Sequence, residues 1–338
     1  MKLRQTRAIE RTGARAVLRN LSPLNFAEGG NPEADYPGYV RAASVVRRWG
    51  ARLVVVQDDV NVLALGDDTG AFRPQLLPWG EGRRRRFDDD LGNKATKLDL
   101  EAGLVLPDGR FVALGSGSSS RRERIVVAWP DGRVALREAG ELYARLRATT
   151  EFAGAELNLE GAVAVGERLR LFQRGNGAPT DDNPTISATA DFALADWVRW
   201  LDGQGVLPPP LAVVQYDLGT LAGVPLGFTD AAALPLKEVV FLAVAEDSAN
   251  AVQDGAVLGC RVGLIQDETA WIWDIENEQG EPLRLKLEGI EPLDEVDGRP
   301  LRFAVVADMD RPDQPALIGT LELHLDALYS ALGAGARP

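Results

Sequence analysis

Alternating apolar and polar positions recur along most of the chain and predict short β-strands joined by turns. Five segments share one order: an alternating strand with a small or acidic residue near its middle, a turn, a strongly apolar second strand, and a polar loop. They are YVRAASVVRRWGARLVVVQDD, KLDLEAGLVLPDGRFVALGSGSSS, LNLEGAVAVGERLRLFQRGNG, LGFTDAAALPLKEVVFLAVAEDS and LKLEGIEPLDEVDGRPLRFAVVADMD. The chain is therefore predicted to be all-β and built from a repeat.

The repeat has a period of about 60 residues. Aligning the segments places Ala42, Glu101, Glu160, Asp230 and Glu288 at one position, at intervals of 59, 59, 70 and 58 residues. Each interval also holds further strand candidates, such as IVVAW, LAVVQYDL and AWIWDI. About four strands per interval are typical of a β-propeller blade. We therefore predict one domain over residues 1–338, folded as a five-bladed propeller.

The last predicted blade is expected to take its fourth strand from the N-terminal segment. After Glu288 only three clear strands remain, so a strand from LRQTRAI or ARAVLRN near the N-terminus is predicted to complete the last blade and close the ring. Six blades remain an alternative if the first 38 residues form more than one strand, although NLSPLNFAEGGNPEADYPG is rich in turn-forming residues. Helical spacing predicts a short inserted helix near residues 195–203, and LELHLDALYSAL predicts a strand that runs into a short C-terminal helix.

Composition narrows the possible chemistry. The net charge of −13 argues against a nucleic-acid binder, and no stretch has the length and hydropathy of a signal peptide or a membrane span, so a cytoplasmic location is expected. Cys260 and His324 are the only cysteine and histidine, which excludes a multi-thiolate metal site and leaves one imidazole for any catalytic triad. The basic run 83–86 is followed by the acidic run 88–90 and is interpreted as a solvated, self-compensating loop.

The aligned acids are the main candidates for chemistry. The first strand of a propeller blade lines the central channel, so Glu101, Glu160, Asp230 and Glu288 are predicted to converge on the axis. Carboxylates held this close raise one another's pKa and require neutralisation. Two alternatives remain open. One is a bound hard cation such as Ca²⁺, which prefers oxygen ligands, and the other is a water-filled channel in which Lys97 and Lys286 pair with the acids.

Five polar loops are expected at the same mouth of the channel. They read QDDVN, GSGSSSRRER, QRGNGAPTDDN, AEDSANAVQDG and ADMDRPDQP. Hydroxyl groups, backbone amides and guanidinium groups in such loops can hold a phosphate or a carboxylate. The candidate ligand-binding residues are Asp58, Lys97, Ser118, Arg121, Arg122, Arg174 and Lys286.

A family resemblance supports this interpretation. The strings KLEGIEPL and LNLEGAVAVGERLRLF resemble the E-G motifs of bacterial β-propellers in the phytase-like or esterase-like group. One acid per blade is also similar to the calcium-activated apyrases, five-bladed propellers whose axial calcium takes one carboxylate or hydroxyl from each blade. The resemblance covers the innermost strands, about a fifth of the chain. It implies Glu101, Glu160 and Glu288 as calcium ligands and Asp230 in place of a hydroxyl ligand. Ala42 departs from the pattern and leaves the first blade without a ligand unless Ser44 reaches in.

Two functional hypotheses follow. The first is a metal-dependent hydrolase that acts on a small phosphorylated or anionic ligand at the loop face. The second is a non-catalytic scaffold that presents this face to a ligand or a protein partner. The sequence assigns no catalytic residue, substrate or oligomeric state to either hypothesis.

Overall fold

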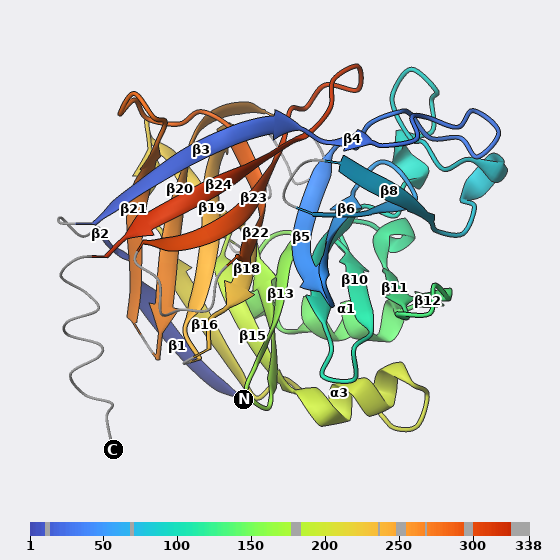
Figure 1. The fold of residues 1–338 in the computed structure, drawn as a ribbon. Coiled ribbons are helices and arrows are strands. Elements are labelled where there is room, and N and C mark those ends of the chain that lie inside the picture. The colour runs from blue at the N-terminus through green and yellow to red at the C-terminus, as the bar shows by residue number, and fades with distance from the viewer. Residues whose placement is uncertain are drawn as a thin grey trace.

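The computed structural model describes residues 1–10, 14–67, 71–176, 184–235, 237–247, 255–267, 269–293 and 300–325 (Figure 1). The predicted C-terminal helix falls almost entirely after residue 325, outside this range. No helix in the described ranges has the length and apolar character needed to cross a membrane.

Most strands of the described chain fall into antiparallel sets of four. The first set is β5 (Ala43–Trp49), β6 (Arg52–Gln57), β7 (Val62–Gly66) and β8 (Ala71–Leu76). The second is β9 (Leu100–Val105), β10 (Phe111–Gly115), β11 (Arg124–Ala128) and β12 (Val134–Glu138). The third is β13 (Leu159–Val165), β14 (Arg168–Gln173), β15 (Ser187–Ala193) and β16 (Ala212–Asp217).

The two remaining sets share one sheet. One contains β18 (Val224–Ala233), β19 (Val239–Asp247), β20 (Ala256–Gln266) and β21 (Thr269–Glu276), with the short β17 (Thr220–Leu221) beside β18. The other contains β22 (Lys286–Pro292), β23 (Leu301–Asp308) and β24 (Leu317–His324), followed by β3 (Arg15–Pro23) from the N-terminal segment. A two-residue parallel pairing of β21 with β3 joins these sets.

The first strands of the sets form a closed circle. β5 contacts β9, β9 contacts β13, β13 contacts β18, β18 contacts β22, and β22 returns to β5. The prediction of an all-β propeller is confirmed by this arrangement. The predicted closure is also present, because β3 comes from the ARAVLRN stretch and pairs antiparallel with β24.

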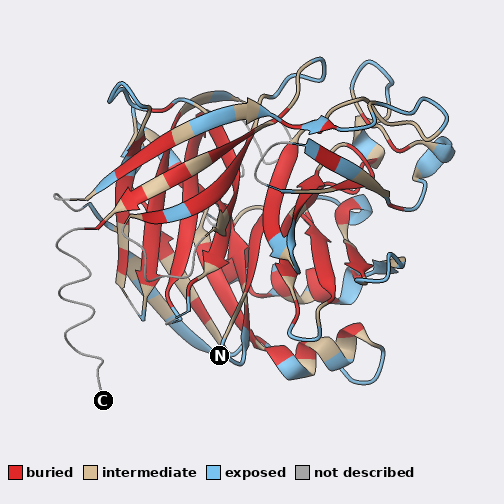
Figure 2. Cartoon of the chain, viewed as in Figure 1, coloured by how far each residue is buried: buried red, intermediate tan, exposed pale blue. Residues whose placement is uncertain are grey.

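The hydrophobic core lies between neighbouring sheets, and the strands that face it are almost continuously buried (Figure 2). The predicted inserted helix is α3 (Leu194–Leu201), which buries Trp197 completely, as expected for a packing residue. Two further helices, α1 (Gly140–Ala148) and α2 (Thr150–Ala153), follow β12 and were not predicted. Short 3₁₀ helices span Glu81–Arg83, Lys94–Thr96 and Ser120–Arg122.

The N-terminal segment wraps around the outside of the propeller. β1 (Lys2–Arg7) pairs with β16, β2 (Ile9–Glu10) with β21, and β4 (Asn25–Phe26) with β8, all in parallel. The first 38 residues therefore do form more than one strand. In their described part, these strands add singly to outer edges and form no further antiparallel set.

The basic run 83–86 is not the solvated loop that its composition suggested. Arg85 is 6% exposed, its guanidinium carbon lies 3.5 Å from the centre of the Trp79 ring, and it donates to the carbonyl oxygens of Leu77 and Ala34. Arg84 forms an ion pair with Asp35 at 2.9 Å. The compensating carboxylate therefore comes chiefly from the N-terminal segment, which the run holds against the first set.

Candidate functional site

Each innermost strand carries a β-bulge, and the bulges define equivalent positions around the axis. The pairing register shifts at Ser44, Glu101, Glu160, Thr229 and Glu288. A bulge adds one unpaired residue and re-aims the side chains that follow it. The structure therefore corrects the predicted alignment in two sets, where the equivalent residues are Ser44 in place of Ala42 and Thr229 in place of Asp230.

The two hydroxyl residues at bulges tie neighbouring strands together. Ser44 Oγ donates to the carbonyl oxygen of Leu100 at 2.6 Å, and Thr229 Oγ1 donates to that of Leu287 at 2.6 Å. Each accepting carbonyl immediately precedes a bulged glutamate. The hydroxyl groups therefore fix the main chain that carries Glu101 and Glu288.

Asp230 belongs to a different layer of the axis from the three glutamates. It is fully buried, and its Oδ2 and Oδ1 accept hydrogen bonds from Arg47 Nη1 and Nη2 at 2.7 and 2.6 Å. Arg47 also donates to the carbonyl oxygens of Gly103, Ala231 and Ile290. This arginine of β5 thereby joins β9, β18 and β22, and Asp230 has both carboxylate oxygens occupied.

The mouth of the axis is a dense network of ion pairs. Lys97 Nζ contacts Asp58 and lies 2.7 Å from Asp99 Oδ1, and Arg122 Nη1 lies 2.9 Å from Asp99 Oδ2. Across the axis, Lys286 Nζ lies 3.2 Å from Glu288 Oε1.

Arg174 bridges two sets at this mouth. Its Nη1 lies 3.3 Å from Glu160 Oε1, and its Nη2 forms an ion pair with Glu246 on the neighbouring set. The predicted internal pairing of lysines with acids is therefore present, and arginines extend it.

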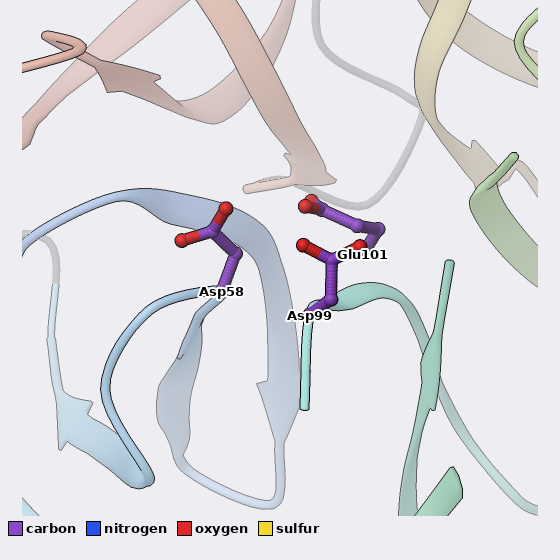
Figure 3. A group of neighbouring side chains, drawn as sticks. All are labelled: Asp58, Asp99 and Glu101. Atoms are coloured by element: carbon purple, nitrogen blue, oxygen red, sulfur yellow. The ribbon is translucent and has the colours of Figure 1, made fainter. Parts of the chain in front are cut away.

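One group of carboxylates is only partly paired by this network, since Lys97 and Arg122 reach Asp58 and Asp99 but not Glu101. Oxygens of Asp58, Asp99 and Glu101 lie within 4.8 Å of one another (Figure 3). Within the described part of the chain, Glu101 forms no hydrogen bond or ion pair, and the buried Asp58 Oδ1 has no hydrogen-bond partner. Burial, followed by the charges of Asp58 and Glu160, raises the pKa of Glu101 well above its usual range.

Other carboxyl groups around the mouth also hold protons more tightly than usual. Burial is the largest cause for each of them: it raises the pKa of Glu160 and of Asp308 to about 7, and that of Asp59 to about 8. The neighbouring Asp58 raises the pKa of Asp59 further. The mouth therefore needs protons or a bound cation to balance its carboxylates at neutral pH.

A cavity of about 350 Å³ opens beside this group. Its walls include Asp58, Asp59, Lys97, Asp308 and Asp310, together with Arg41, which pairs with Asp59 Oδ2 at 2.7 Å. The cavity is therefore polar and mainly acidic, and Asp58 of the carboxylate group forms part of its wall.

A family model spanning residues 39–323 matches this chain and covers most of its length. The chain belongs to DUF6929, a family of unknown function.

Other similarities of this DUF6929 chain are weaker. Ribose-5-phosphate isomerase A from Rhodopseudomonas palustris strain HaA2 is 27% identical over 143 residues, and the match covers 38% of the DUF6929 chain and 60% of the isomerase. The chain thus spans less than two thirds of this curated relative.

Two solved structures also align with the DUF6929 protein. A gluconolactonase from Xanthomonas campestris is 12% identical, with 92% of this chain and 99% of that chain covered and a TM-score of 0.39. A virginiamycin B lyase from Staphylococcus aureus is 10% identical, with 90% and 99% covered and a TM-score of 0.40. Similarity at this level transfers no residue role to the DUF6929 chain.

The predicted ligand-binding residues of the DUF6929 chain fall into two groups. Lys97, Lys286, Arg122 and Arg174 come together at the mouth, each buried and engaged with carboxylates, and half-buried Ser118 accepts a hydrogen bond from Arg122 at 2.8 Å. Arg121 is exposed, and its guanidinium pairs with the exposed Glu81.

Several mouth residues were missed by the sequence reasoning. They are Glu246, Asp308 and Asp310. The alignment held a signal for two of them, because Glu246 and Asp308 lie at the end of the second strand of their sets, as the predicted Asp58 follows the second strand of its own. The repeated acid in QDD, AED and ADMD was therefore a second row of aligned carboxylates.

Proposed function

We propose that this protein is a five-bladed propeller, each antiparallel set being one blade, that binds a hard divalent cation at Asp58, Asp99 and Glu101 and hydrolyses a small ligand in the adjoining cavity. The observation that supports the proposal is the convergence of three carboxylates that the internal cations leave incompletely paired.

The donor set fits calcium or magnesium better than zinc. Hard cations take carboxylate oxygens and waters, whereas zinc prefers imidazole or thiolate ligands. Cys260 is buried within β20, and His324 lies at the end of β24, where it faces Glu322 at 3.6 Å. A cation at the mouth would polarise a phosphoryl or carbonyl oxygen of a ligand and lower the pKa of a bound water.

The chain's own groups would orient the ligand and handle protons. Asp59 lines the cavity, and its pKa of about 8 allows it to hold or accept a proton near neutral pH. Arg41 fixes Asp59 and also pairs with Asp88 at 3.1 Å. Lys97 and Arg122 are engaged with Asp99, so they position the carboxylates, and an anionic ligand would be held chiefly through the cation.

Thermal melting tests the cation site. Adding Ca²⁺ or Mg²⁺ to EDTA-treated protein, at about a hundred times the dissociation constant, should stabilise the fold by about 2.7 kcal/mol. Glu101→Gln should abolish this increase in Tm, while Glu167→Gln, an exposed glutamate in the turn between β13 and β14, should retain it. If neither cation shifts the wild-type Tm, the proposed site is wrong.

Activity is tested separately. Purified protein is assayed with p-nitrophenyl phosphate and p-nitrophenyl acetate, with and without the cation that shifts the melting temperature. We expect cation-dependent turnover that is lost in Glu101→Gln and kept in Glu167→Gln. A cation-dependent Tm without turnover of either ester would support a binding propeller and contradict the hydrolase.

A further inference from the structure

The outer edges of most strand sets are covered by the N-terminal segment. β4 covers part of β8, β1 covers all of β16, and β2 covers part of β21. The fifth outer strand, β3, is itself N-terminal and pairs with β21. Each of these added contacts is parallel. Because an open strand edge invites pairing with another chain, such coverage protects the propeller.

β12 is the exception in the described part of the chain. It pairs with β11 on one side, and no described strand pairs with its other side (Figure 1). Its sequence VALRE has Leu136 at its centre, and this side chain is 37% exposed.

A groove of about 390 Å³ borders β12 and its neighbour β11. It is lined by Leu136 and Arg137 of β12, Glu141 of α1, and Trp200 and Leu201 of α3. Trp200 Nε1 donates to Glu141 Oε2 at 2.9 Å, which fixes the indole between the two helices. The groove therefore places apolar side chains of α3 and charged side chains next to a strand whose outer backbone groups are unpaired in the described part of the chain.

The charges of the groove indicate what it would accept. Arg137 pairs with Ile125 across the sheet, and both residues line the groove, so the Arg137 guanidinium lies on this side. No carboxylate pairs with Arg137 in the described ranges, whereas Glu138 is paired with Arg124 at 2.9 Å. An added strand would bring an acidic side chain to Arg137 at little desolvation cost.

We propose that β12 binds an extended peptide segment of a partner protein, which pairs in parallel along the free edge and places an acidic residue at Arg137 and an apolar residue against Trp200. Residues two positions apart in a strand share a face, so the two side chains are expected at positions i and i+2 of the peptide. The parallel direction follows the pattern of β1, β2 and β4. The inference is independent of the cation site.

A second copy of the chain fits the edge less well. An antiparallel pairing of two β12 strands centred on Leu136 would place Arg137 opposite Ala135 and Glu138 opposite Val134 of the other copy. Neither Arg137 would then meet a carboxylate across the pair.

The test uses an array of N-acetylated eight-residue peptides on an alternating threonine background. Two central positions, i and i+2, lie on the same face of the extended peptide and carry every pair of the twenty amino acids. The probe is the labelled full-length protein. We expect the strongest binding where one position is Asp or Glu and the other is aliphatic or aromatic. Fluorescence polarisation then gives the affinity of the best peptide.

Two perturbations separate strand pairing from simple groove binding. N-methylation of every second peptide amide can start at the first or at the second residue. One of these two patterns should weaken binding about tenfold or more, because the methylated amides then face β12 and the edge loses hydrogen bonds and gains a clash. Arg137→Glu should weaken the acidic peptide about fivefold or more and shift the array toward Lys or Arg. Arg52→Glu, an exposed arginine at the start of β6, should change neither result.

Four results would overturn the proposal. The first is that no peptide binds above the all-threonine background, and the second is that neither pattern of N-methylation changes the affinity. The third is an unchanged residue preference in Arg137→Glu. The fourth is a dimer, seen by light scattering, that Arg137→Glu dissociates in a protein that binds no peptide. Melting curves of Arg137→Glu and Arg52→Glu should match the wild type, since both arginines are exposed.

Discussion

The buried pair of Arg47 and Asp230 offers a sharp test of how the axis is held together. Replacing Arg47 by methionine keeps much of the apolar stem but removes the guanidinium that satisfies both Asp230 oxygens and the carbonyl groups of three neighbouring strands. Asp230 is 0% exposed, so its carboxylate cannot recover these interactions from water. The variant should therefore be destabilised without a change in the mouth residues.

The magnitude follows from the burial of the pair. Removing one partner of a buried ion pair costs about 3–5 kcal/mol. A chain of 338 residues unfolds with an entropy of about 0.7 kcal/mol per kelvin, so a loss of about 4 kcal/mol lowers the Tm by about 6 °C. Arg48→Met is the matched control: Arg48 is exposed, its Nη2 contacts the Leu293 carbonyl oxygen at 3.4 Å, and its loss should cost less than about 0.5 kcal/mol.

The pH dependence of the loss in Tm caused by Arg47→Met gives an independent check. Burial raises the pKa of Asp230, and Arg47 opposes this effect, so removing Arg47 raises the pKa further. A carboxyl group whose pKa is higher in the folded state than in the unfolded state takes up a proton on folding and destabilises the fold increasingly as pH rises above the unfolded value. The Tm deficit of Arg47→Met should therefore be larger at pH 8 than at pH 5. Differential scanning calorimetry at both pH values measures this, and a deficit below about 1 kcal/mol at pH 8, or one that does not shrink at pH 5, would refute the reasoning.

Two further predictions concern single buried positions. Burial raises the pKa of the Cys260 thiol to about 12, so the thiol should resist iodoacetamide in the native protein at pH 8 and react rapidly in urea. If the native protein were labelled as fast as an exposed thiol, the burial of Cys260 would be contradicted. Gly289→Ala should destabilise by about 1–3 kcal/mol, because a Cβ there would lie 2.7 Å from the Val46 amide nitrogen, whereas Gly205→Ala, whose Cβ would meet Arg199 Cβ at 3.6 Å, should be nearly neutral in urea denaturation.

Much of the fold could be predicted because strand burial is a local property. Alternation with period two indicated the first two strands of each set, and the helical spacing of Trp197 and Leu201 indicated α3. The helix α1 was missed because its buried residues Leu142, Tyr143 and Leu146 form a narrow stripe in a largely polar segment. Only packing against the neighbouring sheets makes that stripe sufficient for a helix.

The row of acids at the axis was predicted in part because it, too, follows from local sequence. The recurrence of Glu101, Glu160 and Glu288 follows from equivalent bulges in equivalent strands, and the sequence shows it directly. In the fourth set, two adjacent polar residues, Thr229 and Asp230, could each occupy the bulge. One step along a strand reverses the face of a side chain, so the alignment placed Asp230 at the bulge that Thr229 occupies in the structure.

The sequence by itself determined the all-β repeat and the row of bulged acids, because each of these depends on neighbours within a few residues. The count of strands after Glu288 also indicated the closing strand from the N-terminus. Tertiary structure alone decided that Arg47 meets Asp230, 183 positions away, and that Asp58 from one loop joins Asp99 and Glu101. It also decided that no strand of the described chain pairs with the outer side of β12. These contacts exist only after the ring closes, since closure brings distant segments of the chain to a common axis and sends the N-terminal segment past some outer edges but not past β12.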